Sequence, residues 1–303
     1  MIKKIIFISI FIAAILSSSI YANCFDKEPG SIKIGEYPEF SYVKITTIGS
    51  ALGLVPISSW SDIEESKWKK SKGSFLLQGV GFVIKGGYII TAAHVVNPGQ
   101  IVTNPNKYSR YIDKPIKIIH RSIIITAGTE IDRIEYGTYA EIYYLDIKHD
   151  IAILKFDPEN IYDSLPYELY ETRYLSEDGL GGFCNLIQPG DSVAMIARCR
   201  DKNRNWAVGF EVRYGKIVSV GIEGIPENKV PAFNMNDFTT DIIIHPGDSG
   251  SAMFAFSFGK PVIIGIARAN NDYYSPLGRE LAKENPRSYA TRIDFVKKML
   301  ESG

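Results

Sequence analysis

Residues 75–96 read FLLQGVGFVIKGGYIITAAHVV, and this stretch decides the class of fold. The runs 75–84 and 88–91 are rich in valine, isoleucine and aromatic residues, and a Lys-Gly-Gly turn separates them. This pattern predicts a β-hairpin, because such residues favour strands and glycine supplies the backbone angles of a tight turn. His94 follows the second strand closely and is a first candidate for chemistry.

Outward from this hairpin, short strand-like segments occur in two clusters with no alternating helices, which favours antiparallel β-barrels or a sandwich over an α/β fold. Residues 51–73 are expected to form an extra loop. Only the end looks helical, where Asp294 can cap a segment with one apolar face. The other expected strands cover residues 116–119, 122–126, 139–145, 151–156, 191–197, 206–220, 239–244, 251–256 and 262–267.

The first 22 residues combine a basic start, an apolar run from Ile5 to Leu16 and small residues before Ala22. This is the pattern of a secretory signal peptide. A membrane anchor is the alternative, but the run is shorter than the roughly 20 residues that a spanning helix needs. We therefore expect cleavage after Ala22, a secreted or periplasmic protein, and no membrane contact after cleavage.

The chain has three cysteines, Cys24, Cys184 and Cys199. In an exported protein, Cys184 and Cys199 lie close enough in sequence to flank one strand and form a disulfide, which leaves Cys24 over. Three free thiols fit the count equally well, because the number of cysteines does not define their connectivity.

Composition excludes several classes of partner. Lysine plus arginine and aspartate plus glutamate both number 34, so no net charge draws the chain to nucleic acid or acidic lipid. No His-Glu-x-x-His motif or clustered His/Cys spacing indicates a metal site. The stretch 79–81 lacks the third glycine of a dinucleotide-binding loop and leads into a strand. We expect no metal and no cofactor, and composition does not define the oligomeric state.

The tetrapeptide Pro-Gly-Asp-Ser occurs twice, ending at Ser192 and at Ser249. Ser249 lies between Gly247 and Gly250, so its loop can turn sharply and aim backbone N–H groups at a developing oxyanion. Ser192 precedes an apolar run and is typical of a turn that starts a strand. Ser249 is therefore the candidate nucleophile.

A serine hydroxyl needs a nearby base that a carboxylate orients. His94 is the preferred base among four histidines, because two alanines before it allow a tight turn that presents the ring. Asp150 begins the apolar run Ile-Ala-Ile-Leu, where a carboxylate can be buried at the end of a strand. Asp146 competes for this role, but the residues that follow it are more typical of a solvent-exposed stretch.

Three segments stand in this order: TAAHVV at 91–96, HDIAIL at 149–154 and GDSGSAMF at 247–254. They resemble the catalytic segments of the chymotrypsin-like (trypsin-like) serine proteases, closer to the bacterial HtrA-type and glutamyl-endopeptidase-like branches. The spacings of 56 and 99 residues between the three candidates suit that family with some enlarged loops. The resemblance covers roughly residues 79–302. It implies two six-stranded antiparallel β-barrels with the active site in the cleft between them, without a PDZ domain.

Carried over residue by residue, the resemblance implies that Ser249 is the nucleophile, His94 the general base and then acid, and Asp150 its orienter. The N–H groups of Gly247 and Ser249 would form the oxyanion hole. No Ile-Val-Gly-Gly start is visible. Asp248 is therefore expected to hold a lysine, an arginine or a loop N–H in place of a new N-terminus.

The implied organisation has four parts. A signal peptide covers residues 1–22, and an N-terminal extension with the first barrel covers 23–160. An inter-barrel linker covers 161–188, and the second barrel with a C-terminal helix covers 189–303.

For specificity, the resemblance places Ile243 at the base of the primary pocket, so a preference for Lys or Arg is not expected. Ala267 and Ala269 on the following strand suggest a small or aliphatic substrate residue. Arg268 offers an acidic preference as the alternative, but Ala267 stands where acid-specific relatives place a histidine. Arg268 can equally point away on an alternating strand.

The expected function is a secreted serine endopeptidase that cuts protein or peptide substrates through an acyl-enzyme. The alternative is a non-catalytic protease-like binding protein or toxin on the same scaffold, because a fold does not dictate a function. The presence of all three candidate catalytic residues favours the enzyme.

Overall fold

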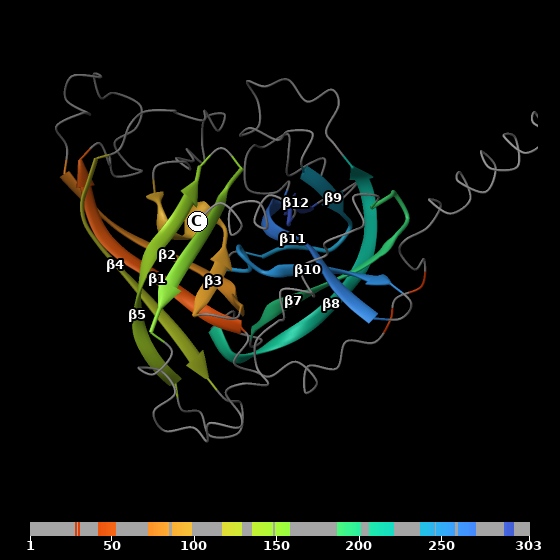
Figure 1. Ribbon diagram of the computed structural model, residues 1–303, viewed down its shortest axis with the longest axis horizontal. Helices are drawn as coiled ribbons and strands as arrows, with labels where there is room; N and C mark the ends of the chain where they lie inside the picture. The colour runs from red at the N-terminus through yellow and green to blue at the C-terminus, as the bar shows by residue number, and fades with distance from the viewer. Residues whose placement is uncertain are drawn as a thin grey trace, which may run out of the picture.

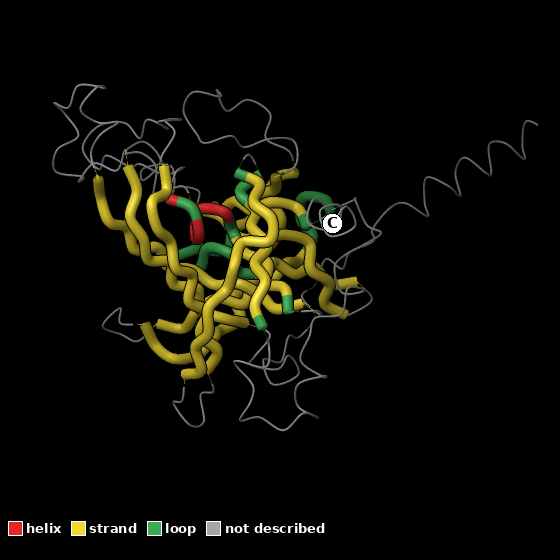
Figure 2. Tube along the Cα trace, turned by 60° about the vertical axis from the view of Figure 1, so that its left-hand side comes forward, coloured by secondary structure: helices red, strands yellow, loops and turns green. Residues whose placement is uncertain are grey.

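Twelve strands and one short helix account for the regular structure in the described part of the chain. The computed structural model describes residues 28, 30, 42–52, 72–84, 87–98, 117–128, 135–147, 149–157, 187–200, 206–220, 237–245, 247–257, 260–270 and 288–293. Figure 2 shows this trace as nearly all strand. The expected signal peptide, the candidate disulfide at Cys184, the linker and the C-terminal helix from Asp294 lie outside the described residues, apart from the linker's last two positions.

The strands close into two separate barrels, which confirms the predicted fold class. Antiparallel pairing links the first six in the order β1-β2-β3-β6-β5-β4 and the last six in the order β10-β11-β12-β9-β8-β7. Figure 1 shows the two barrels side by side. The first comprises β1 (Tyr42–Leu52), β2 (Lys72–Ile84), β3 (Tyr88–Thr91), β4 (Lys117–Gly128), β5 (Glu135–Asp146) and β6 (Ile151–Phe156). The second comprises β7 (Ser192–Arg200), β8 (Trp206–Val220), β9 (Asp237–Thr240), β10 (Ala252–Ser257), β11 (Lys260–Asn270) and β12 (Ser288–Arg292).

The first four residues of β6 are all apolar, and the packing of the strand explains why. Ala152 and Leu154 pack inside the first barrel, whereas Ile151 and Ile153 join a cluster that also contains second-barrel residues. Because side chains alternate along a strand, both faces of β6 are buried over residues 151–154, and the exposed Lys155 follows them. Asp150 immediately precedes this strand, so the packing of β6 places it beside the second barrel.

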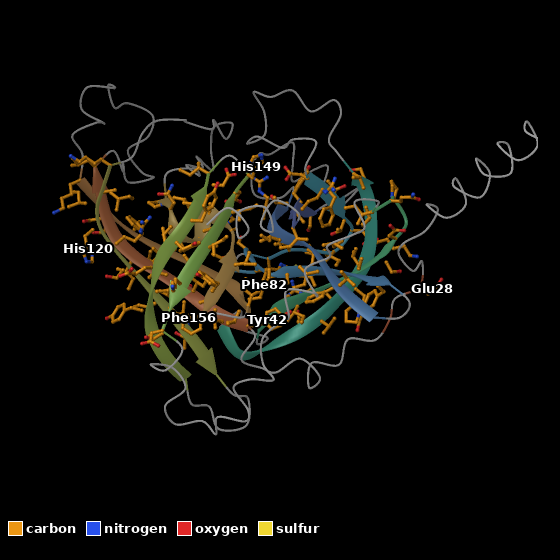
Figure 3. The ribbon with its side chains drawn as sticks, in the orientation of Figure 1. Glu28, Tyr42, Phe82, His120, His149 and Phe156 are labelled. Atoms are coloured by element: carbon orange, nitrogen blue, oxygen red, sulfur yellow. The ribbon has the colours of Figure 1, made fainter. Side chains whose placement is uncertain are left out.

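The same alternation operates across the barrel junction in the second half of the chain. Phe254 and Phe256 of β10 lie in the shared cluster with Phe82 of β2, whereas Met253 and Ala255 face the interior of the second barrel. Figure 3 shows Phe82 between the two barrels. Burial of each such side chain contributes about 1.5–3 kcal/mol, so this contact fixes one barrel against the other.

Three expectations about strands differ from the structure. Residues 117–119 and 122–126 of two separately expected strands lie in one continuous strand, β4, and the strand expected at 239–244 ends as β9 at Thr240. Strands β1 and β12 were not among the expected strands. No helix among the described residues is long and apolar enough to cross a membrane.

Candidate active site

His94 lies on α3 (Ala93–Val96), a single helical turn that follows β3. Gly79 of β2 lets this turn approach the second barrel. A Cβ at Gly79 would lie 2.5 Å from the Val95 side chain and 2.7 Å from the carbonyl oxygen of Ser249. The missing side chain therefore brings the helix that carries His94 and the loop that carries Ser249 against the same point of β2.

Asp150 holds His94 through two hydrogen bonds. The His94 Nδ1 atom lies 2.8 Å from Asp150 Oδ2, and the His94 backbone N–H donates to Oδ1 at 2.9 Å. The backbone of Asp150 has φ = +56°, which aspartate tolerates better than most residues other than glycine. The turn before β6 thus adopts an uncommon backbone conformation that directs this carboxylate to the imidazole.

Asp146, the competing candidate, pairs with a different histidine. Its Oδ2 atom lies 2.5 Å from His149 Nδ1, and its Oδ1 atom accepts the His149 backbone N–H at 3.0 Å. Figure 3 shows His149 at the junction of the barrels and His120 on the far side of the first barrel. The structure therefore brings Asp150, and not Asp146, to His94.

The Asp150 carboxyl is charged under ordinary conditions despite its burial. Burial acts to raise its pKa, but the charges of His94 and Arg268 and the hydrogen bonds from His94 outweigh that effect. Together they lower the pKa of Asp150 from 3.8 to about 2. A permanent carboxylate beside Nδ1 favours the imidazole tautomer that carries its proton on Nδ1 and leaves Nε2 as the acceptor.

The serine loop is a tight turn that two glycines make possible. Gly247 and Gly250 have φ near +90°, in the left-handed region that favours glycine. A Cβ at Gly250 would collide with the carbonyl of Val80, while the Val80 N–H donates to the Ser249 carbonyl at 2.9 Å. The loop is thus anchored on β2 of the opposite barrel, close to α3.

Ser249 is part-buried, and its hydroxyl donates to the carbonyl oxygen of Arg268 at 3.1 Å. Within the described residues no hydrogen bond joins it to His94. The backbone N–H groups of Gly247 and Ser249 donate to no acceptor in that same part of the chain. Donors left without an internal acceptor in a glycine turn can bind an oxyanion.

Asp248, the residue before the serine, is held by Arg213 of β8. The Arg213 Nη1 atom donates to Asp248 Oδ2 at 2.6 Å, and the His245 backbone N–H donates to the same oxygen at 2.8 Å. The expectation that an arginine or a loop N–H holds Asp248 is confirmed by both contacts. Arg213 also donates to the Ile243 carbonyl, so one side chain connects both ends of the loop.

Replacing Arg213 by methionine is expected to lower the free energy of unfolding by about 3–5 kcal/mol, because Asp248 would become a buried charge without its cation. Glu211 provides the matched control, since it contacts the same guanidinium but is 44% exposed. Glu211→Gln is expected to cost less than about 1 kcal/mol. Urea denaturation at pH 7 measures both. Equal losses for the two variants would show that Asp248 does not depend on Arg213.

The first Pro-Gly-Asp-Ser copy is a turn that starts a strand, as predicted. Gly190 has φ = +89°, Asp191 accepts the Gln188 N–H at 2.7 Å, and the buried Ser192 begins β7. Its serine therefore lies within a barrel wall.

The candidate specificity residues occupy different environments. The Ile243 side chain is 49% exposed, Ala267 is fully buried, and the side chain of Ala269 lies outside the description. Arg268 is 7% exposed and binds two aspartates, Asp150 and Asp237. Sequence reasoning did not single out Asp237. No group of three or more His, Cys, Asp or Glu side chains among the described residues is placed to bind a metal.

Two closed six-stranded antiparallel barrels joined along one face define the chymotrypsin class of fold. The chain belongs to the trypsin-like peptidase domain family, whose model matches residues 79–266, and the predicted family is confirmed. Serine peptidase activity is the function that this family supports. The search of curated proteins found no match.

Two solved structures are similar to this chain at low sequence identity. Deg5 is 18% identical with a TM-score of 0.48, over 87% of this chain and 88% of that one. The HtrA-type protease AlgW, solved with a decapeptide, is 18% identical with a TM-score of 0.49, over 93% of this chain and 66% of that one.

Proposed function

We propose that this protein is a serine endopeptidase in which His94, Asp150 and Ser249 form the catalytic triad. The observation that carries the proposal is the 2.8 Å contact from His94 Nδ1 to Asp150 Oδ2, beside a glycine-flanked serine loop. A carboxylate that binds Nδ1 leaves Nε2 as the base that a serine nucleophile requires.

The proposed reaction proceeds through an acyl-enzyme. The Ser249 hydroxyl turns from the Arg268 carbonyl toward His94, loses its proton to Nε2, and its oxygen attacks the peptide carbonyl carbon. The N–H groups of Gly247 and Ser249 donate to the oxyanion that forms. His94 then returns the proton to the departing amine as the peptide C–N bond breaks. In the second half of the reaction, water loses a proton to His94 and attacks the ester carbonyl of the acyl-enzyme. The ester bond then breaks, His94 returns the proton to the Ser249 oxygen, and the carboxylic acid leaves.

Substrate preference and location are further parts of the proposal. Arg268 is the candidate cation for an acidic substrate residue, but two buried aspartates already bind its guanidinium. This supports a preference for a small or aliphatic residue before the cut. The first 22 residues support secretion or a periplasmic location, since their pattern is that of a signal peptide.

A fluorophosphonate probe tests the proposal, because it reacts with a serine only when a base activates it. The form that begins at Asn23 is treated beside its Ser249→Ala variant. Labelling of the wild type alone supports the enzyme. Labelling of neither would favour the alternative, a non-catalytic binding protein. The hydrogen bond from the Ser249 hydroxyl to the Arg268 carbonyl supports that alternative, because the hydroxyl is directed away from a base. Equal labelling of both would place the nucleophile elsewhere.

A further inference from the structure

Arg268 departs from the regular alternation of its strand. In the pairing of β11 with β12, Ala267 lies opposite Ala290 and Ala269 opposite Tyr289, so Arg268 is the extra residue of a β-bulge. A bulge redirects a side chain relative to its neighbours on the strand. The Arg268 side chain is consequently buried and directed toward Asp150 of the other barrel.

The guanidinium bridges two carboxylates. Its Nε donates to Asp150 Oδ2 at 3.1 Å, and its Nη1 donates to Asp237 Oδ2 at 2.9 Å. Asp237 is fully buried, and its other oxygen lies 3.1 Å from the Thr291 hydroxyl. A planar guanidinium with several donors in fixed directions suits this double contact, whereas a lysine ammonium does not present the same fork.

We propose that Arg268 is a positioning residue of the active site, which holds Asp150 in place for His94 while Asp237 balances its charge. This inference deepens the proposed function and rests on it. His94 Nδ1 and Arg268 Nε both contact the same oxygen, Asp150 Oδ2, so the two side chains hold this oxygen together. The Arg268 carbonyl also accepts the Ser249 hydroxyl, so this residue contacts two members of the triad.

The charge balance predicts opposite effects for the two outer partners. Among the described residues, charged or titratable groups lie around His94 and Asp150 on several elements: Arg268 from β11, Asp237 from β9, the Asp146–His149 pair beside the turn, and Arg121 from β4, which donates to the Val96 carbonyl on α3. Loss of the Arg268 charge leaves a more negative environment, in which the protonated and inactive imidazolium persists to higher pH. Loss of the Asp237 charge leaves a more positive environment, in which the imidazolium loses its proton at lower pH.

Steady-state kinetics against pH test this with three single variants. Arg268→Met is expected to lower kcat about 100-fold through misplacement of Asp150, with little change in KM. Its acidic limb of kcat/KM should move up by about one pH unit, and that of Asp237→Asn down by about half a unit. Arg268→Lys should restore the wild-type position of the limb but not the full kcat, because it keeps the charge and loses the fork.

The double variant Arg268→Met with Asp237→Asn controls for misfolding, since it removes the ion pair of Arg268 with Asp237 and leaves the net charge of the cluster as in the wild type. Its acidic limb should return to the wild-type position while kcat stays low. A kcat for this variant within twofold of wild type would overturn the proposal. Limb shifts in the same direction for Arg268→Met and Asp237→Asn would also overturn it.

A measurement without turnover separates this inference from the proposed function. In the Ser249→Ala background, NMR follows the pH at which the His94 ring resonances move. Arg268→Met should raise that pH and Asp237→Asn should lower it, whether or not the wild type reacts with a fluorophosphonate. Opposite shifts in a protein that the probe does not label would support the coupling and refute the peptidase. Absent shifts in a labelled protein would refute the coupling alone.

Discussion

Replacing His94 by alanine is expected to lower kcat for peptide hydrolysis on the order of a million-fold, because the proposed nucleophile Ser249 would lose its proposed base, the histidine that Asp150 binds. Ser249→Ala and the double variant should each lose about as much, since a catalytic triad acts as a unit and its losses do not add. Cleavage of a fluorogenic peptide with a small residue before the cut measures kcat.

The fold is expected to survive the loss of the His94 ring. Asp150 keeps the hydrogen bond from the backbone N–H of residue 94 and the ion pair with Arg268, so its charge retains two partners. His149→Ala is the matched control, because His149 also binds an aspartate through Nδ1 but belongs to a separate pair. Its kcat should stay close to the wild-type value. Loss of activity in His149→Ala with retention in His94→Ala would reassign the base.

The parts of the fold that sequence predicted are those whose signal is local. The hairpin of β2 and β3 combines alternation with a glycine turn, and β6 begins with four apolar residues that are buried on both faces. Both were predicted and both are confirmed. In each case the residues of the segment itself define the strand, without knowledge of its neighbours.

Of the two missed strands, β12 depends on its partners, whereas β1 does not. Strand β12 is a five-residue segment of small and polar residues, and it becomes a strand because β11 and β9 pair with it on its two sides. After the end of β9 the opposite mismatch occurs, since apolar residues are present but do not form a strand. Ile242 and Ile244 are apolar and buried, yet the Ile244 N–H donates to the Ser288 hydroxyl instead of continuing a ladder. Strand β1 alternates and carried a usable signal.

The same distinction applies to the candidate site. His94, Asp150 and Ser249 stand in short segments whose flanking residues suggest their chemistry. The role of Arg268 depends on a bulge against β12 and on Asp237, which is 31 residues away in the chain. No pattern within β11 reveals that bulge, because it arises from the register with the partner strand.

Asp150→Asn is expected to lower kcat about ten-thousand-fold at neutral pH, because an amide no longer enforces the tautomer with a free Nε2. The exchange keeps the size of the side chain, and asparagine also tolerates the φ of +56°. The fluorogenic peptide assay measures this loss, and circular dichroism checks that the fold is retained. A kcat within tenfold of wild type would show that Asp150 does not orient the base.

Stability against pH provides a second measurement on the same variant. The pKa of Asp150 falls from 3.8 to about 2 on folding, so ionised Asp150 stabilises the native state above pH 4 by about 2 kcal/mol. This contribution is lost as the pH falls from about 4 through 2, because the unfolded chain then takes up the proton first. Asparagine carries no such proton. The stability difference between wild type and Asp150→Asn should therefore shrink by about that amount over this range, as urea denaturation at each pH measures. Parallel stability curves would mean that the contacts of His94 and Arg268 with this carboxylate do not favour its charged form.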